Sequence, residues 1–138
     1  MNKNNVFKIY PARFYIEWEK ENIIISTVKQ NPISKEQIIN QAFSLHSQGK
    51  ILEAIKYYQY FVDLGFEDCI VFSNYGTILK GINKIKEAEY FLRKAIKLDA
   101  DFAEAYNNLG NILRDTGKLR EAESVTLKAI KIKPDYRI

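Results

Sequence analysis

The chain has few of the residues that would cross-link or interrupt its backbone. Its 138 residues include one cysteine, three prolines and six glycines. The single cysteine, Cys69, excludes an internal disulfide and suits a reducing compartment. The low glycine and proline content excludes collagen-like and linker sequences and favours regular structure throughout.

Long apolar runs and charged blocks are also lacking. No stretch approaches the ~20 apolar residues that cross a bilayer, and the opening MNKNNVFKIYPARF has no apolar signal segment. We therefore expect no membrane partner and a cytoplasmic location. The net charge of +4 comes from 21 basic and 17 acidic residues that are interleaved, so nucleic acid is not an expected partner.

Residues suited to catalysis are equally scarce. His46 is the only histidine, it has no Cys or His at metal-ligand spacing, and Cys69 has no adjacent base. Phosphate-loop and nucleophile-elbow motifs are absent. Acidic pairs such as Glu87 with Glu89 lie two apart on expected helices and point in different directions, which indicates a solvated face. We therefore predict no catalytic residue, cofactor, metal ion or enzymatic activity.

What the sequence does contain is a repeat. Steps of 34 residues align polar, acidic, small and turn residues: Asn40 with Asn74 and Asn108, Lys50 with Lys84 and Lys118, Glu53 with Glu87 and Glu121, Ala54 with Ala88 and Ala122, and Gly49 with Asn83 and Gly117. Agreement at one spacing is typical of stacked supersecondary units. A capping box of Ser34 and Gln37 precedes the first apolar-periodic run. The pattern predicts six helices, at 34–47, 51–63, 69–81, 86–98, 103–115 and 120–132.

The last copy carries the residues of a known family. The large, small and helix-ending positions of the tetratricopeptide repeat (TPR) signature are occupied by Tyr106, Leu109, Gly110, Leu113, Ala122, Ala129 and Pro134. The chain therefore resembles TPR proteins. The resemblance implies an all-α fold, a right-handed superhelical array of three helix-turn-helix repeats at about 35–68, 69–102 and 103–136, within a TPR domain at 34–138. Gly110 should let the partner helix approach closely.

Residues 1–33 do not fit the repeat. Phe14, Ile16 and Trp18 alternate with other residues, which indicates a strand that 23–28 could join as a hairpin. A lone hairpin is marginal in water, so this leader could instead continue as a helix, stay mobile, or fold back into the protein's own groove.

The two ends of the array are predicted to differ. The stripe of each first helix that should meet the preceding repeat is polar in copy one and mainly apolar in the others: Gln37, Gln41, Ser44 and Gln48, then Val71, Tyr75, Ile78 and Ile82, then Ala105, Leu109, Ile112 and Thr116. Unpaired polar groups are costly in a core, so copy one should start the array. The last helix carries Val125, Leu127 and Ile130, which should seek cover in a longer array or in a homodimer through the C-terminal helix.

Equivalent residues of successive first helices should line one groove. We predict that it binds an extended peptide through Asn40, Phe43, Asn74, Thr77, Lys80, Asn107, Asn108, Asn111 and Arg114. The ladder of Asn40, Asn74 and Asn108 would bond a peptide backbone, because an amide offers both a donor and an acceptor. The alternative is that these asparagines only brace neighbouring helices. In the carboxylate clamp of related TPR proteins the matching sites hold Lys, Asn, Asn, Lys and Arg, whereas this chain has Ile39, Phe43, Asn74, Glu104 and Asn108, so a chaperone tail is not an expected ligand.

The function that these features predict is a protein–protein interaction module. It would be a TPR adaptor or scaffold whose concave groove holds a protein or peptide partner. Two alternatives stay open. The repeats could be the N-terminal TPR part of a larger transferase-type protein, or a module that homodimerises through its uncapped C-terminal helix.

Overall fold

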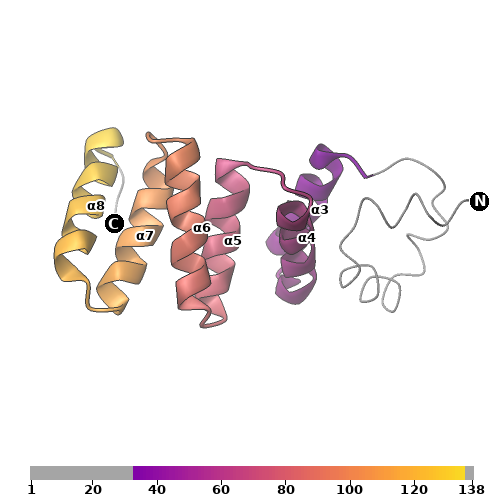
Figure 1. The fold of residues 1–138 in the computed structure, drawn as a ribbon, viewed down its shortest axis with the longest axis horizontal. Helices are drawn as coiled ribbons and strands as arrows, with labels where there is room; N and C mark the ends of the chain where they lie inside the picture. Colours follow the sequence, from indigo (N-terminus) through magenta and orange to yellow (C-terminus); the bar gives the residue numbers. More distant parts are fainter. Residues whose placement is uncertain (1–32, 136–138) are drawn as a thin grey trace, which may run out of the picture. The chain divides into compact units, whose positions relative to one another are not determined.

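The computed structural model describes residues 33–135, which form helices joined by short connections (Figure 1). The predictions for the leader, whether strand, helix or mobile segment, fall outside the described residues apart from Ile33.

Six helices pair into three helical hairpins. These are α3 (Lys35–Ser47) with α4 (Ile51–Asp63), α5 (Cys69–Gly81) with α6 (Ile85–Leu98), and α7 (Ala103–Asp115) with α8 (Leu119–Ile132). Residues 33–135 contain no strand. Every helix bound lies within one residue of the predicted one. The predicted all-α fold of helix-turn-helix repeats is confirmed.

Two of the helices begin at capping side chains. Before α3, the Ser34 hydroxyl accepts a bond from the Gln37 backbone N–H at 3.1 Å, and Gln37 Oε1 accepts one from the Ser34 N–H at 2.8 Å. This is the predicted capping box, which satisfies two N–H groups at once. Before α5, the Asp68 carboxylate accepts from the N–H groups of Ile70 and Val71.

The turn inside each hairpin depends on one residue with positive φ. Gly49, Asn83 and Gly117 have φ of 74°, 63° and 77°. Glycine and asparagine tolerate this left-handed conformation better than other residues. The alignment of these three turn residues in the sequence therefore reflects one backbone requirement.

The helices belong to two compact units, which divide between Phe66 and Glu67. The first unit contains the α3–α4 hairpin. Its core joins both helices and comprises Ile38, Ala42, Leu45, Ala54, Tyr58, Tyr60 and Phe61, all buried. The predicted polar stripe of α3 is exposed along its length.

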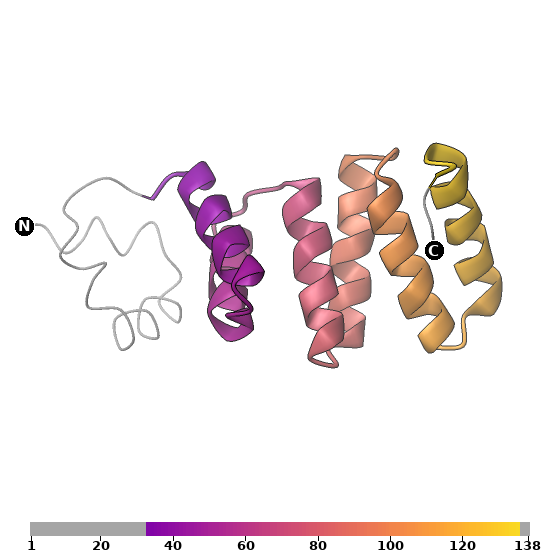
Figure 2. The ribbon, with the colours of Figure 1, turned by 180° about the vertical axis from the view of Figure 1, so that it is seen from behind.

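The second unit, Glu67–Ile138, stacks one hairpin on another (Figure 2). Helix α7 packs against both α6 and α5. Ala105, Leu109 and Ile112 are at most 1% exposed, whereas Thr116 is exposed. The apolar stripe predicted for the third copy is thus buried, except for its last position.

Glycines set the distance between the helices of each hairpin in this unit. A Cβ atom on Gly76 would lie 2.9 Å from Leu92 Cγ, and one on Gly110 would lie 2.6 Å from Thr126 Oγ1. A Cβ on Gly76 would also lie 3.1 Å from the Ala88 carbonyl oxygen, so a side chain at position 76 would push the helices apart. At position 110 the short contact is with the end of the Thr126 side chain, and the Ala122 carbonyl oxygen lies 3.6 Å away. The close approach predicted at Gly110 is confirmed.

Candidate functional site

The predicted groove residues are divided between the two units. Asn40, which is exposed, and Phe43 lie on α3. The other seven lie on α5 and α7, which are neighbours in the second unit (Figure 2). We call these seven the α5–α7 face: Asn74, Thr77, Lys80, Asn107, Asn108, Asn111 and Arg114. The alignment of Asn40 with Asn74 and Asn108 in one ladder stays a prediction.

On the α5–α7 face, a hydrogen-bond chain connects the two helices. Asn108 Nδ2 donates to Thr77 Oγ1 at 3.2 Å, and Thr77 Oγ1 donates to the Ser73 carbonyl oxygen at 3.0 Å. Asn108 therefore braces α7 on α5, as the alternative to the ladder predicts. Its Oδ1 atom has no hydrogen-bond partner among the described residues and is available as an acceptor.

One turn further along α7, the side-chain amide of Asn111 has its oxygen bonded, whereas Asn108 has its nitrogen bonded. Arg114 Nη2 donates to Asn111 Oδ1 at 2.5 Å. Because this bond occupies the oxygen, Asn111 presents its Nδ2 donor, which has no acceptor within 33–135. Asn108 and Asn111 are three residues apart and so share one side of the helix. The α5–α7 face thus offers an acceptor and a donor side by side.

The cations of this face differ in their partners. Lys80 Nζ forms an ion pair with Asp115 Oδ2 at 2.8 Å, and the hydrogen bond from Lys80 lowers the pKa of the Asp115 carboxyl below its ordinary value. Arg114 is exposed and forms no direct ion pair among residues 33–135, although its charge also lowers the pKa of Asp115. The repeat does not predict a role for Asp115, because Gly81 occupies the same position in copy two. The opposite charges of Lys80 and Asp115 were the signal that could have found the pair.

Asn74 and Asn107 complete the α5–α7 face. Both are half-buried, and neither forms a hydrogen bond within the described part of the chain. Glu104 is exposed in the first turn of α7, the helix that also carries Asn107. In the first unit, Phe43 is half-buried against the Tyr58 ring, with centroids 6.3 Å apart.

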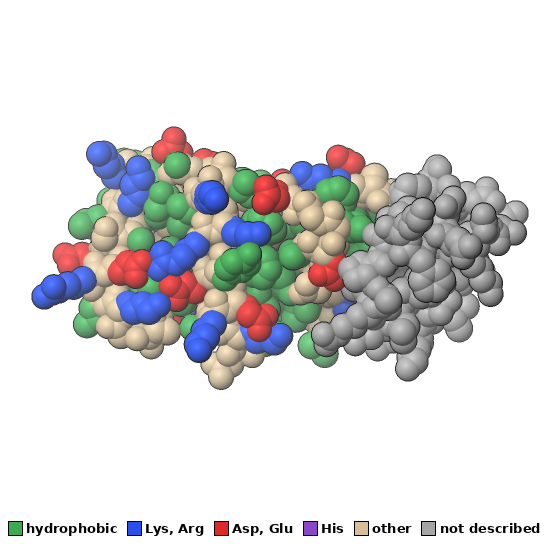
Figure 3. Space-filling view, in the orientation of Figure 1, with side chains coloured by type: hydrophobic (Ala, Val, Ile, Leu, Met, Phe, Trp, Pro, Cys, Tyr) green, Lys and Arg blue, Asp and Glu red, His purple; other side chains and the backbone are tan. Residues whose placement is uncertain are grey.

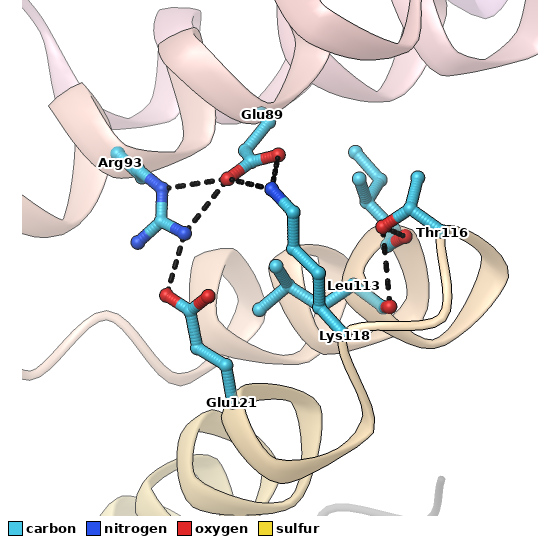
Figure 4. A network of polar contacts seen from close by, with 7 residues as sticks. Glu89, Arg93, Leu113, Thr116, Lys118 and Glu121 are labelled. Carbon is cyan, nitrogen blue, oxygen red and sulfur yellow. Dashed lines mark hydrogen bonds and ion pairs between the residues drawn. The ribbon is translucent and has the colours of Figure 1, made fainter.

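A separate polar cluster connects α6 to the beginning of α8 (Figure 4). Glu89 lies at its centre, with Oε1 2.7 Å from Arg93 Nη2 and Oε2 2.9 Å from Lys118 Nζ. Arg93 Nη2 also lies 2.6 Å from Glu121 Oε1. Burial raises the pKa of Glu89, but the bonds from Arg93 and Lys118 outweigh it and hold the pKa below its ordinary value.

This cluster corrects the expectation of a solvated acidic face. The Glu89 side chain is only 17% exposed and links two repeats, whereas Glu87 is exposed and pairs with Lys84 in its own turn, at 3.5 Å. Elsewhere, Figure 3 shows basic and acidic side chains mixed over the helices on the side drawn.

Helices α3–α8 include none with the length and apolar character needed to cross a membrane. Within the same part of the chain, no three His, Cys, Asp or Glu side chains gather as a metal site would require.

Comparisons with known proteins agree with this geometry. Two tetratricopeptide repeat family models match residues 71–102 and 91–124. The crystal structure of MamA is 22% identical with a TM-score of 0.70, over 88% of this chain and 65% of that chain. This chain therefore spans about two thirds of MamA. No curated protein matches the chain in sequence.

Two other solved structures share the fold. The first TPR of Spaghetti (RPAP3), bound to the HSP90 peptide SRMEEVD, is 20% identical with a TM-score of 0.69, over 79% of this chain and 86% of that chain. The Arabidopsis OM64 TPR domain is 16% identical with a TM-score of 0.69, over 75% of this chain and 85% of that chain. Together with the helical hairpins and the positive-φ turns, these matches show that the chain contains tetratricopeptide repeats within residues 71–124 and has the TPR fold.

Proposed function

We propose that this protein is a protein–protein interaction module that binds an extended peptide on the α5–α7 face. The observation that carries the proposal is the orientation of two amides. Asn108 presents an acceptor because its nitrogen is bonded to Thr77, and Asn111 presents a donor because its oxygen is bonded to Arg114. An extended peptide exposes backbone N–H and C=O groups that such a pair can bond without reading the side chains.

Family members support the class of ligand. Both the first and the second TPR of Spaghetti (RPAP3) are described as bound to the HSP90 peptide SRMEEVD. The present chain keeps only Asn74 of the five residues of the carboxylate clamp. We therefore propose a peptide ligand of a different sequence, held by its backbone rather than by a C-terminal carboxylate.

Arg114 would supply a side-chain preference. It is exposed beside Asn111 and forms no direct ion pair among the described residues, while the neighbouring Asp115 carboxylate is paired with Lys80. A guanidinium pairs well with a carboxylate because it offers several donors in a planar fork. The favoured peptide would therefore place an acidic residue near Arg114.

The test is capture of partners from native cell extract by the immobilised chain, followed by mass spectrometry. We expect Asn74→Ala, Asn111→Ala and Arg114→Ala each to lose the partners that the unchanged chain captures, while circular dichroism shows full helicity. Ser124→Ala on α8 is the matched control, because it removes an exposed polar group outside the α5–α7 face. If all three variants kept the same partners, the proposal would be overturned. The two alternatives, a part of a larger transferase-type protein and a homodimer through α8, stay predictions.

A further inference from the structure

Helices α6 and α8 carry cations at equivalent repeat positions. On each helix three basic residues are spaced by eight and then three positions, which puts them on one side of the helix. We call these six residues the α6–α8 basic face: Lys86, Lys94 and Lys97 on α6, and Arg120, Lys128 and Lys131 on α8. Lys94 is half-buried and the other five are exposed. Each row is about 16 Å long, since a helix rises about 1.5 Å per residue.

The cations of the basic face have no carboxylate partners. None of the six forms an ion pair within residues 33–135. Three of the four acids on the same two helices, Glu87, Glu89 and Glu121, pair with cations that lie outside the basic face. Figure 4 shows the pairs of Glu89 and Glu121, which also hold the beginning of α8 beside α6. The fourth acid, Glu123, is exposed and has no ion pair in the described part of the chain.

The two rows are a local pattern of the second unit. The residues 34 positions before the α6 row are Leu52, Tyr60 and Asp63 on α4, and none of them is basic. Residues 67–135 contain 12 basic and 11 acidic residues, which are interleaved along the sequence. The helical period separates the two signs, because residues spaced by three, four or eight positions share a side and their neighbours in sequence do not. The basic face therefore arises from spacing and not from an excess of positive charge.

This arrangement favours an acidic polypeptide over other polyanions. Nucleic acids and anionic lipid surfaces present dense, continuous negative charge, and they attract proteins through the field of an overall basic domain. A unit of nearly balanced charge does not supply that field, and the unpaired Glu123 would face such a ligand. The carboxylates of a polypeptide are carried on separate flexible side chains, so they can reach the basic rows and avoid Glu123.

We propose that the α6–α8 basic face binds an extended acidic segment of another protein. Segments rich in one sign of charge stay disordered and often act as interaction tails, so they can follow a row of cations without needing a groove. The carboxylates of the segment pair with the exposed lysines and Arg120. Because the basic face and the α5–α7 face lie on different helices, the acidic segment occupies a second site, separate from that of the extended peptide.

The experiment measures the fluorescence anisotropy of a labelled oligoglutamate of about 12 residues, which spans up to about 40 Å when extended and can follow either row. Titration with the full chain should show saturable binding that weakens about fivefold between about 0.05 and about 0.3 M salt, because salt screens exposed charges. Lys86→Gln, Lys97→Gln and Lys131→Gln together should weaken binding about tenfold, since each exposed ion pair contributes about a factor of two. Ser124→Lys, which adds a cation to the α8 row, should tighten binding about twofold.

The matched control makes the same change of net charge in the first unit. Gln41→Glu, Lys50→Gln and Leu52→Glu together also lower the net charge by three, at exposed positions, and should weaken binding by less than about twofold. Failure of the oligoglutamate to bind, or equal weakening by the two triple variants, would overturn the proposal. If Arg114→Ala weakened binding as much as the lysine variant, the acidic segment would lie on the α5–α7 face and the proposal would be wrong. Tighter binding of single-stranded DNA of the same length, or of vesicles of phosphatidylcholine and phosphatidylserine, would contradict it as well.

Discussion

The first hairpin and the hairpins of the second unit have the same helix-turn-helix backbone, but they carry different side chains at equivalent repeat positions. In the second unit three polar links join one hairpin to the next: Thr77 with Asn108, Lys80 with Asp115, and the pair Glu89 and Arg93 with Lys118 and Glu121. The residues 34 positions before the α5 and α6 members are Phe43, His46, Ile55 and Gln59. Phe43 and Ile55 have no hydrogen-bonding atoms in their side chains, and Gln59 has an amide in place of the Arg93 charge.

Two of these residues pack within their own hairpin instead. The Phe43 and His46 rings lie 6.3 Å and 6.2 Å from the Tyr58 ring, and His46 Nδ1 lies 3.2 Å from Tyr58 Oη. The repeat therefore preserves the helices and turns, whereas the side chains between them decide whether a position connects two hairpins or fills one.

The largest expected effect tests the glycine that allows close packing. Ala42, Gly76 and Gly110 occupy one repeat position, so the first hairpin accepts a Cβ there and the second unit does not. Gly76→Val should lower the free energy of unfolding by about 2–3 kcal/mol, because the new side chain overlaps Leu92 and the Ala88 carbonyl. Urea unfolding followed by circular dichroism measures the change.

Gly81→Ala is the matched control, since nothing lies within 4 Å of its added Cβ and alanine favours a helix. It should leave the free energy of unfolding unchanged or raise it. A Gly76→Val variant as stable as the unchanged chain would show that the hairpin can relax, and the contrast with Ala42 would lose its physical basis.

The sequence predicted the helices and turns because both depend on nearby residues. Apolar periodicity and the positive-φ turn residues act within a few positions, and the 34-residue step repeats them three times. The close approach at Gly110 was predictable for the same reason. The links between hairpins were not, because they join side chains 28 to 35 residues apart, as Arg93 with Glu121 and Lys80 with Asp115 do.

The candidate site was predicted as a set of residues but not as an arrangement. The sequence placed all seven predicted residues of the α5–α7 face on first helices, and the structure has them on α5 and α7. The sequence could not show that Asn108 is oriented by Thr77 and Asn111 by Arg114, because the orientation of an amide depends on which neighbour bonds it. The sequence also assigned Glu89 to a solvated face. Its partner Arg93 lies on the same helix, but its second partner, Lys118, comes from the next repeat and could not be foreseen.

Hydrogen exchange should show the difference between the units directly. We expect backbone amides of α3 and α4 to exchange about tenfold faster than those of α5–α8, because within its own unit each of α3 and α4 packs on a single helix, whereas α7 packs on both α5 and α6. Mass spectrometry of peptic fragments over Lys35–Asp63 and Cys69–Ile132 measures the two rates. Equal protection would mean that the polar links of the second unit add nothing to its local stability.

Glu89→Gln should have a smaller effect, of about 1 kcal/mol, because its two partners are 43% and 50% exposed and therefore screened. The folded pKa of Glu89 is lowered, so its contribution is present above the ordinary glutamate value of 4.5 and is lost as the pH falls through the folded pKa. The difference between the unchanged chain and the variant should thus be full at pH 7 and shrink below about pH 4.5. Urea titrations at several pH values measure it.

Glu87→Gln serves as the control for this prediction. Glu87 pairs only with Lys84 in its own turn, at 3.5 Å and with both side chains 53% exposed, so its replacement should change stability by far less. If the two variants were equally stable at pH 7, the cluster around Glu89 would not strengthen the junction between the hairpins.

The smallest expected change in stability compares Asn108 with Asn40, which occupy the same position in different repeats. Asn108 bonds Thr77, whereas Asn40 is exposed and forms no bond within residues 33–135. Asn108→Ala should cost about 0.5 kcal/mol, since the lost hydrogen bond is partly offset by the helix propensity of alanine, and should lower the melting temperature by about 2–4 °C. Asn40→Ala should leave the melting temperature unchanged or raise it, because it gains the propensity and loses no bond. An equal decrease in both variants would show that position 40 also braces the fold, and only a stability measurement of this kind separates a bracing amide from one kept free for a ligand.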